Sequence, residues 1–275
     1  MKTLAAFRRG PVWLRSVLLW RVVLLLVLLG AWELASGTLV PQLFISKPSM
    51  VIPRIIELFP TSELWTAVGI TYYEVAVGYV LAAVTGIVLG VVLGRSAFLA
   101  AVTEPFIMTL YSLPKIALAP LFILWLGVGL ESKIAIVFIS ALFLVMFNTF
   151  AGIRGINEEF INLARIMGAN WRDVNFRVIL PAAFPSIFLG LKAAMPYAVI
   201  GAVTGEFMAS NSGLGFNILR SGNTLDTTSM FAWLFFLVVG VTVVNELLRL
   251  VEKRVLRWQP GSGTRARRVR TPAVA

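Results

Sequence analysis

Apolar stretches long enough to cross a membrane recur along most of the 275-residue chain, with short polar segments between them. Val75–Leu93, for example, gives 19 positions without a charged residue, and Ile134–Ile153 gives 20. A helix of about 20 apolar residues spans the hydrocarbon layer of a bilayer. The pattern predicts an all-α fold, a polytopic membrane helix bundle of about six transmembrane helices. The expected spans are Val17–Ser36, Val75–Leu93, Glu104–Gly127, Ile134–Ile153, Ala183–Phe207 and Thr227–Asn245.

The first apolar stretch allows two interpretations. Basic residues precede it and Ala35-Ser36-Gly37 lies at its end, a pattern that also fits a cleaved signal peptide. Its length, and the further spans that follow it, favour a first helix that is retained in the membrane.

Small residues at regular spacing indicate where the spans pack. Residues four positions apart share one face of a helix, and small side chains allow two membrane helices to approach closely. Two such series occur, and we expect both to be helix-packing faces. They are Gly86, Gly90 and Gly94 in the second span and Ala194, Ala198 and Ala202 in the fifth.

The third span is expected to be broken, because Pro105, Pro114 and Pro120 interrupt it and Lys115 lies near its middle. Irregular backbone at membrane depth is tolerated where it lines protein or water, and a charge there is costly unless it is solvated or paired. We therefore take Tyr111, Pro114 and Lys115 as candidate residues of a translocation pathway. Glu206, at the outer end of the fifth span, is a further candidate.

Each of these charges has a plainer interpretation. Lys115 would then snorkel to an interface or pair structurally, and Glu206 would be an ordinary charge at the membrane surface. Lys192, in the inner half of the fifth span, is expected to reach the cytoplasmic interface.

Basic residues orient the bundle. The formal net charge is +11, and the lysines and arginines gather beside the apolar stretches. With both termini in the cytoplasm, 17 of them lie on the cytoplasmic side and 4 outside, namely Lys47, Arg54, Lys133 and Arg220. Cytoplasmic loops carry such an excess, so the sequence predicts a multi-pass protein with both termini inside. The partner of these basic residues is the lipid bilayer, and no nucleic-acid partner is expected.

The residue types exclude several kinds of chemistry. The chain has no cysteine and no histidine, which rules out disulfides, thiol nucleophiles and the usual zinc or haem ligation. The carboxylates of Glu33, Glu74, Glu206 and Glu246 are scattered and suggest no reactive cluster. We expect no enzyme activity, no metal site and no cofactor on this chain.

The cytoplasmic segment between the fourth and fifth spans, residues 157–181, is predicted to form two short helices. Asn157 and Asn170 are expected to cap them, and Gly168 to end the first in a left-handed conformation. Pro181 is expected to break the second helix before the fifth span. Phe160, Leu163, Ala164 and Met167 should share one face of the first helix, and Trp171, Val174 and Val178 one face of the second.

The spacing of Asn162-Leu163-Ala164, Gly168, Val178 and Leu180-Pro181 resembles the EAA loop of ABC importer permeases of the binding-protein-dependent class. That pattern is Glu-Ala-Ala, three residues, Gly, nine residues, Ile, one residue and Leu-Pro, so Asn162 and Leu163 depart from it. Further motifs look like the nitrate, sulfonate, taurine and pyrimidine-precursor branch. They are Leu113-Pro114-Lys115, Trp125–Gly129, Gly205-Glu206-Phe207 and Ser212–Gly215.

The resemblance implies the permease subunit of an ATP-binding-cassette importer in a prokaryotic plasma membrane. The solute would be small and polar or anionic, such as nitrate, a sulfonate, taurine or a thiamine precursor. The implied partners are a second permease copy in a homodimer, a dimer of ATP-binding subunits and an extracytoplasmic solute-binding protein. The residues implied to couple to the ATP-binding subunit are Asn162, Leu163, Ala164, Gly168, Ala169, Asn170, Leu180 and Pro181.

ATP hydrolysis is expected on a separate subunit, because the chain lacks a Gly-x-x-x-x-Gly-Lys-[Ser/Thr] phosphate loop. The alternative function is a secondary transporter or channel, which would need no ATP-binding partner. Three parts are expected along the chain. They are a cytoplasmic segment over 1–16, a permease domain over 17–258 with its core at 66–250 and the coupling loop at 157–181, and a disordered basic cytoplasmic tail over 259–275.

Overall fold

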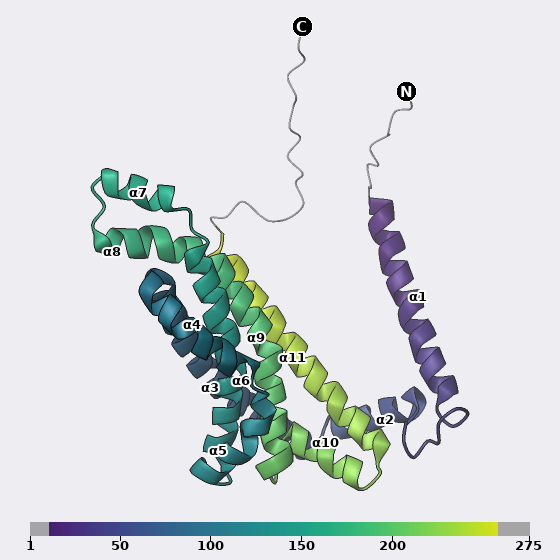
Figure 1. The fold of residues 1–275 in the computed structure, drawn as a ribbon. Helices are drawn as coiled ribbons and strands as arrows, with labels where there is room; N and C mark the ends of the chain where they lie inside the picture. Colours follow the sequence, from purple (N-terminus) through teal and green to yellow (C-terminus); the bar gives the residue numbers. More distant parts are fainter. Residues whose placement is uncertain (1–10, 258–275) are drawn as a thin grey trace. The chain divides into compact units, whose positions relative to one another are not determined.

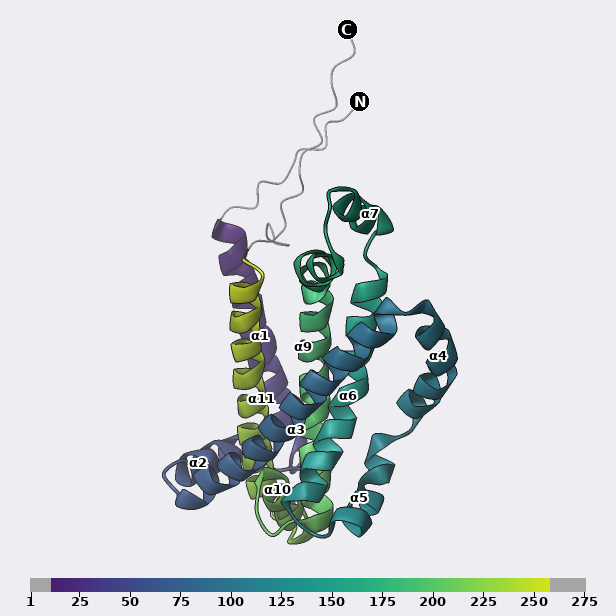
Figure 2. The same cartoon turned by 90° about the vertical axis from the view of Figure 1, so that its left-hand side faces the viewer.

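The computed structural model describes residues 11–257. In this range the chain is helical without a β-strand, apart from an isolated bridge between Ser36 and Val40, which confirms the all-α prediction (Figures 1 and 2). The elements are α1 (Pro11–Ala35), α2 (Pro48–Leu58), α3 (Ser62–Arg95), α4 (Ala97–Ser112), the 3-10 turn η1 (Lys115–Leu118), α5 (Ala119–Leu126), α6 (Leu130–Arg154), α7 (Glu158–Ile166), α8 (Trp171–Asp173), the π-helix η2 (Val174–Ile179), α9 (Leu180–Ala209), α10 (Leu214–Asn223) and α11 (Thr227–Val255).

Among the described residues, four helices are long and apolar enough to cross a membrane: α3, α6, α11 and the continuous helix Trp171–Ala209. A fifth candidate is the pair of helices Ala97–Ser112 and Lys115–Leu126, which meet at a bend of 84°. These five coincide with the second to sixth predicted spans. The first predicted span is helical as α1, but it adds no further candidate, so the count of six is not confirmed.

The bend in the third span has a local cause. Leu113 is extended, with φ −63° and ψ 136°, because a proline forces the residue before it out of the helical region. Pro114 also has no N–H to continue the helix, so α4 ends at Ser112. The predicted break is confirmed at Pro114. The interruption predicted at Pro105 is wrong, because α4 continues through it. Pro120 lies in the first turn of α5, where a proline is tolerated.

The described residues form two compact units, 73–209 with 240–257, and 11–72 with 210–239. In the first unit, α6 packs against α9 and against the glycine face of α3. A Cβ atom added to Gly90 would lie 2.6 Å from the Cβ of Thr149. One added to Gly190 of α9 would lie 2.6 Å from the Cβ of Asn148. Both separations are far shorter than van der Waals contact, so only glycine fits.

Both predicted packing faces are confirmed. Added Cβ atoms at Gly86 and Gly94 would also collide with α6, at 3.0 Å from the carbonyl oxygen of Leu142 and 2.7 Å from the Cβ of Ile153. The three alanines of the fifth span, Ala194, Ala198 and Ala202, are completely buried.

Polar contacts connect the elements of the second unit. The backbone N–H of Leu214, at the start of α10, donates to the hydroxyl of Thr71 at 2.8 Å. The hydroxyl of Tyr72 donates to the carbonyl of Leu237 at 2.8 Å, which joins α3 to α11. The side chain of Arg54 in α2 donates a hydrogen bond to the hydroxyl of Ser229 in α11 at 2.9 Å.

The structure describes the predicted terminal segments only in part. The tail over 259–275 lies outside the described residues. Of the segment over 1–16, residues 11–16 are described and belong to α1, which therefore begins six residues before the predicted first span.

Candidate functional site

The coupling segment, residues 157–181, lies beyond the ends of α6 and α9 (Figures 1 and 2). Its first helix, α7, is capped as predicted, because the side-chain oxygen of Asn157 accepts a hydrogen bond from the backbone N–H of Glu159 at 2.9 Å. Glu158 and Glu159 occupy the first turn, where their negative charge suits the positive end of the helix dipole. The cap fixes where the chain turns away from α6.

A two-bond turn ends α7. The N–H of Gly168 donates to the carbonyl of Arg165 at 2.9 Å, and the N–H of Ala169 donates to that of Ala164 at 3.0 Å. This pair of bonds is a Schellman cap, which needs a left-handed residue at its centre. Gly168 has φ +89°, so the predicted conformation is confirmed, and a residue with a Cβ would be strained there.

The second helix of the segment begins as predicted. The side-chain oxygen of Asn170 accepts a hydrogen bond from the N–H of Asp173 at 3.0 Å. The turn between α7 and α8 is therefore held by backbone bonds on one side and by a side-chain cap on the other, and this makes it a defined hairpin rather than a free loop.

The expected break at Pro181 is wrong. α8 passes through the π-helix η2 into α9, and Trp171–Ala209 is one helix of 39 residues. In η2 the N–H of Leu180 donates to the carbonyl of Asn175, five residues earlier. The wider π turn gives room for the ring of Pro181, which would clash with the preceding turn of a regular α-helix, so the helix continues.

One side of the coupling segment packs against the bundle. The packed side chains are small or branched and partly buried, and they cover an apolar cluster built by α6, η2 and α9. The partly buried residues are Ile161, Ala164 and Ala169, and the cluster comprises Ile153, Val174, Ile179, Ala183 and Ile187.

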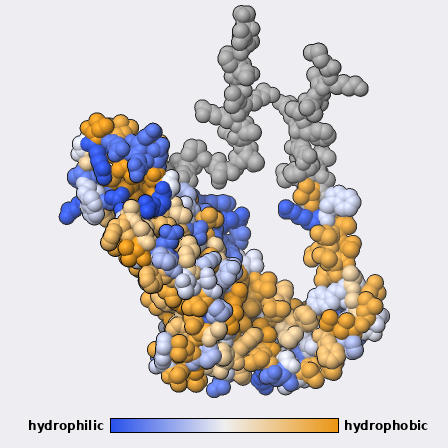
Figure 3. Space-filling model, in the orientation of Figure 1, coloured by the Kyte–Doolittle hydropathy of each residue, from blue (hydrophilic) through white to orange (hydrophobic). Residues whose placement is uncertain are grey.

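The other side exposes large apolar side chains, which we call the docking face. Figure 3 shows orange patches among blue side chains at the end of the molecule formed by α7 and α8. The members of the docking face are Phe160 (64% exposed), Leu163 (55%), Ile166 (83%), Met167 (80%), Trp171 (71%) and Phe176 (65%).

The predicted faces of the two helices are only partly right. Phe160, Leu163 and Met167 are exposed together, but Ala164 lies on the packed side. In the second helix Trp171 is exposed whereas Val174 is buried, because the hydrogen-bond spacing changes from four to five residues at Val174.

The eight residues expected to couple to a partner fall into two groups. Four are exposed at the surface or turn of the segment, and four are partly buried where it joins the bundle. The exposed ones are Asn162, Leu163, Gly168 and Asn170, and the partly buried ones are Ala164, Ala169, Leu180 and Pro181.

The break in the third span brings Tyr111, Pro114 and Lys115 together. The ammonium group of Lys115 donates a hydrogen bond to the carbonyl of Tyr111 and lies 4.4 Å from the centre of the Tyr111 ring. It also lies 5.8 Å from the centre of the Phe143 ring of α6. Lys115 thus has structural partners within its own turn, as the plainer interpretation expects, and a role in a pathway stays a prediction.

Glu206 does not occupy the exposed interfacial position of the plainer interpretation. It is 1% exposed, whereas the next two residues, Phe207 and Met208, are 41% and 51% exposed, so one side of the end of α9 is covered. Its neighbour Gly205 is in close contact with α6, where an added Cβ would lie 3.0 Å from the Cγ of Lys133. Packing therefore groups Glu206 with this end of α6.

Sequence reasoning missed a buried ion pair between Glu74 of α3 and Lys133 of α6. Their side chains are 0% and 8% exposed. Lys133 was assigned to an external loop, but it lies in the first turn of α6. A signal was present, since Glu74 directly precedes the charge-free stretch Val75–Leu93 and Lys133 directly precedes the charge-free stretch Ile134–Ile153. The second and fourth spans run in the same direction, so both residues reach the same membrane face.

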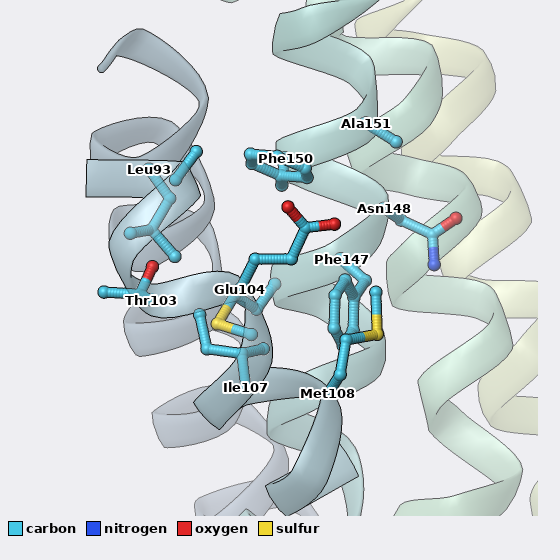
Figure 4. A pocket seen from close by; sticks show the side chains of 11 residues that line it. Leu93, Thr103, Glu104, Ile107, Met108, Phe147, Asn148, Phe150 and Ala151 are labelled. Carbon is cyan, nitrogen blue, oxygen red and sulfur yellow. The ribbon is translucent and has the colours of Figure 1, made fainter. Parts of the chain in front are cut away.

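A cavity of about 400 Å³ between α3, α4 and α6 was also missed. Its lining is mainly apolar, with Leu93, Phe147 and Phe150 among the wall residues. Figure 4 shows the carboxylate of Glu104 pointing toward the two phenylalanine rings. The ring of Phe147 also contacts that of Tyr111 at 5.1 Å between centres, so the cavity adjoins the broken span.

Known protein sequences resemble the chain over most of its length. Residues 82–257 match the family described as "Binding-protein-dependent transport system inner membrane component". SsuC of Bacillus subtilis, named for aliphatic sulfonate transport, is 32% identical over 90% of this chain and 88% of its own. The formylaminopyrimidine transport permease ThiX of Halalkalibacterium halodurans is 30% identical, over 85% and 93%. The taurine transport permease TauC of Escherichia coli is 26% identical, over 82% and 84%.

The fold also occurs in a solved structure. A chain of the MetNI methionine ABC transporter, captured in an inward-facing conformation, superposes with a TM-score of 0.61. The match covers 73% of this chain and 98% of that one at 22% sequence identity. At this identity the likeness concerns the arrangement of the helices alone.

Proposed function

Because the chain belongs to the family of binding-protein-dependent transport system inner membrane components, we propose that it works with a separate ATP-binding subunit that docks on the coupling segment. The observation that carries this proposal is the docking face, six large apolar side chains exposed on a capped helical hairpin. Apolar patches on a polar, non-spanning segment mark protein interfaces. ATP would bind and be hydrolysed on the partner.

A rigid hairpin suits this task. The cap at Gly168 and the side-chain cap at Asn170 hold the turn, and Ile161 and Ala164 tie it to the bundle. Motion of a partner seated on the docking face would therefore move α9 instead of bending the segment. Alternate exposure of the pathway to the two sides follows from such rigid-body movement.

The further partners of the assembly are a second copy of this chain and an extracytoplasmic binding protein. The family description names binding-protein dependence, which supports the second of these. In a homodimer the pathway would lie between two copies, so one chain would supply half of its lining.

The pathway is proposed to include Tyr111, Pro114, Lys115 and Glu206. Support comes from the break after Ser112, which frees backbone groups at membrane depth, and from the partly exposed ammonium of Lys115 beside it. The names of the relatives mention aliphatic sulfonates, formylaminopyrimidine and taurine, which supports a small polar or anionic solute for this chain.

Replacing Gly168 tests the coupling role. Gly168→Val is expected to lower ATP-dependent uptake at least tenfold while the partner still hydrolyses ATP, because a β-branched residue resists positive φ and distorts the hairpin. Taurine uptake and phosphate release would be measured together, in proteoliposomes that contain this chain, the ATP-binding subunit and the binding protein.

Gly127 provides the matched control. It has φ +82°, and like Gly168 it has no atom within 4 Å of an added Cβ, but it lies between α5 and α6. Gly127→Val is expected to leave ATP hydrolysis and uptake coupled in the protein that folds. Normal coupling in Gly168→Val would contradict the proposal, and uptake by the chain without an ATP-binding subunit would favour a secondary transporter.

Orientation can be tested with single cysteines, since the chain has none of its own. Ile166 and Leu39 are each 83% exposed. With both termini in the cytoplasm, a membrane-impermeant maleimide should label Leu39→Cys in intact cells and Ile166→Cys only in opened cells. The reverse pattern would place the coupling segment outside and remove its access to an ATP-binding subunit.

A further inference from the structure

Two polar pockets adjoin each other in the unit that contains α2, the start of α3, α10 and the start of α11. One has a volume of about 230 Å³ and the other of about 260 Å³. Glu63, Asn217 and Arg220 line both of them. The two pockets therefore form one groove, which we call the α10 groove, with these three side chains along its middle.

The floor of the α10 groove carries two polar side chains that form no hydrogen bond in the described part of the chain. Asn217 and Ser221 lie one turn apart on α10 and are 6% and 8% exposed. Over residues 11–257, neither the side-chain amide of Asn217 nor the hydroxyl of Ser221 has a hydrogen-bond partner. Neither is among the described side chains whose polar atoms are buried without a partner, so their polar atoms are accessible from the groove. Both groups line the groove, so a bound molecule would satisfy them.

Two opposite charges at the groove also lack partners. Within the described part of the chain, neither Arg220 nor Glu63 forms an ion pair, with each other or with a third residue. Glu63 lies in the first turn of α3, and Arg220 lies on α10 next to Ser221. The groove therefore presents one available cation and one available anion.

The remaining charges of the groove are already engaged. Arg54 donates hydrogen bonds to Ser229 at 2.9 Å and to Glu57 at 3.0 Å. Burial opposes ionisation of Asp226, but hydrogen bonds from the hydroxyl and N–H of Ser229 and the charge of Arg54 outweigh it and lower the pKa of Asp226. Asp226 thus stays ionised beside Arg54, and Arg54 is engaged by both Glu57 and Asp226.

We propose that the α10 groove binds a small zwitterion, with its acidic group on Arg220, its ammonium group on Glu63, and its polar atoms against Asn217 and Ser221. A ligand with a single charge would leave either Glu63 or Arg220 without a partner, whereas a zwitterion pairs both. The site is separate from the broken third span, and binding there needs no ATP-binding subunit.

Calorimetry on the purified full chain in lipid nanodiscs tests this proposal with three probes of similar size. They are β-alanine, which carries both charges, and propionate and propylamine, which carry one each. β-Alanine should bind at least tenfold more tightly than either of the others, a difference of about 1.4 kcal/mol. Arg220→Gln and Glu63→Gln should each weaken β-alanine binding at least tenfold.

Arg249→Gln is the matched control, because Arg249 is exposed and pairs with Glu246 of α11, away from the groove. It should bind β-alanine like the unchanged chain. Asn217→Leu should abolish β-alanine binding. Arg220→Gln and Glu63→Gln test the site independently of Asn217→Leu, because they change exposed side chains instead of a buried one.

Several outcomes would overturn the proposal. No binding of β-alanine, equal binding of propionate, or unchanged binding in both charge variants would each do so. Failure of the zwitterion proposal can be distinguished from failure of the proposed ATP-driven mechanism, because the binding measurement contains no ATP-binding subunit. Gly168→Val should also leave β-alanine binding unchanged.

Discussion

The packed helices α3, α6 and α9 and the docking face of the coupling segment use apolar residues in opposite ways. Between the helices, glycines and alanines are buried and bring backbones into contact, as at Gly90 and Ala198. On the docking face, large side chains such as Ile166 and Trp171 are mostly exposed. The first arrangement is complete within one chain, and the second leaves its apolar surface uncovered.

The exposed apolar surface of the coupling segment needs a protein partner, whereas that of the spans does not. Exposed apolar residues on the spans can face lipid, which solvates them. Those of the coupling segment alternate with charged residues such as Glu158 and Arg165, in a segment that does not span. Substitutions among the packed helices should therefore change stability, and substitutions on the docking face should change affinity for a partner.

The largest effect is expected at the buried ion pair. Lys133→Met should destabilise the chain by about 3–5 kcal/mol, because it leaves the carboxylate of Glu74 buried without its cation. Adding Glu74→Leu should restore most of the loss. Thermal unfolding in detergent would measure both variants.

Lys192 serves as the control for that experiment. Its ion pair with Glu252 at 2.7 Å joins α9 to α11 and is partly exposed, at 36% and 20%. Lys192→Met should therefore cost less than about 1 kcal/mol. If the single Lys133 variant and its double variant unfolded at the same temperature, the pair would not act as an isolated buried unit.

An intermediate effect is expected at the glycine face of α3. Gly90→Ala should cost about 1–3 kcal/mol, since its Cβ would lie 2.7 Å from the carbonyl oxygen of Met146 and backbone would have to move. Gly69, on the same helix, has no atom within 4 Å of an added Cβ. Gly69→Ala should instead stabilise by up to about 1 kcal/mol. Thermal unfolding would measure both variants. If Gly90→Ala and Gly69→Ala changed the unfolding temperature equally, α3 and α6 would not be in close contact at Gly90 in the membrane.

The smallest effect on stability is expected at the docking face. The double variant Ile166→Ser and Met167→Ser should change unfolding by less than about 0.5 kcal/mol, because both side chains are already exposed. It should nevertheless weaken binding of the ATP-binding subunit at least tenfold, as loss of apolar anchors does. Titration of the purified partner would measure this.

Leu39→Ser is the control for the docking face, because Leu39 is equally exposed but lies between α1 and α2. It should leave the partner's affinity unchanged. If both changes weakened binding equally, general surface hydrophobicity would account for the contact, without a specific role for the docking face.

Local chemistry explains which features could be predicted from the sequence. Gly168 ends a helix and Asn157 caps the start of one. The preference for glycine and asparagine at these positions depends only on a few neighbouring backbone groups. The break at Pro114 likewise follows from the proline ring alone. The glycine series on α3 predicted a packing face, because its spacing is that of one side of a helix.

The missed features depend on helices that are distant in sequence. The pairing of Glu74 with Lys133 requires α3 and α6 to be adjacent and in register, which neither residue reveals by itself. The burial of Glu206 requires the end of α9 to be covered by other elements. Pro181 was misjudged for a different reason, since its usual effect on an α-helix is removed by the π turn in front of it.

The uninterrupted course of the helix from Trp171 to Ala209 has a mechanical consequence. Trp171 on the docking face and Glu206 near the far end belong to one rod, and at 1.5 Å per residue they are roughly 50 Å apart along it. The helix contains the π turn η2 and two interior prolines, Pro185 and Pro196, but it is continuous through all of them. We therefore expect a tilt imposed at the end that carries Trp171 to displace the opposite end. We expect the backbone of one helix to link the proposed ATP-binding partner to the opposite end of the bundle.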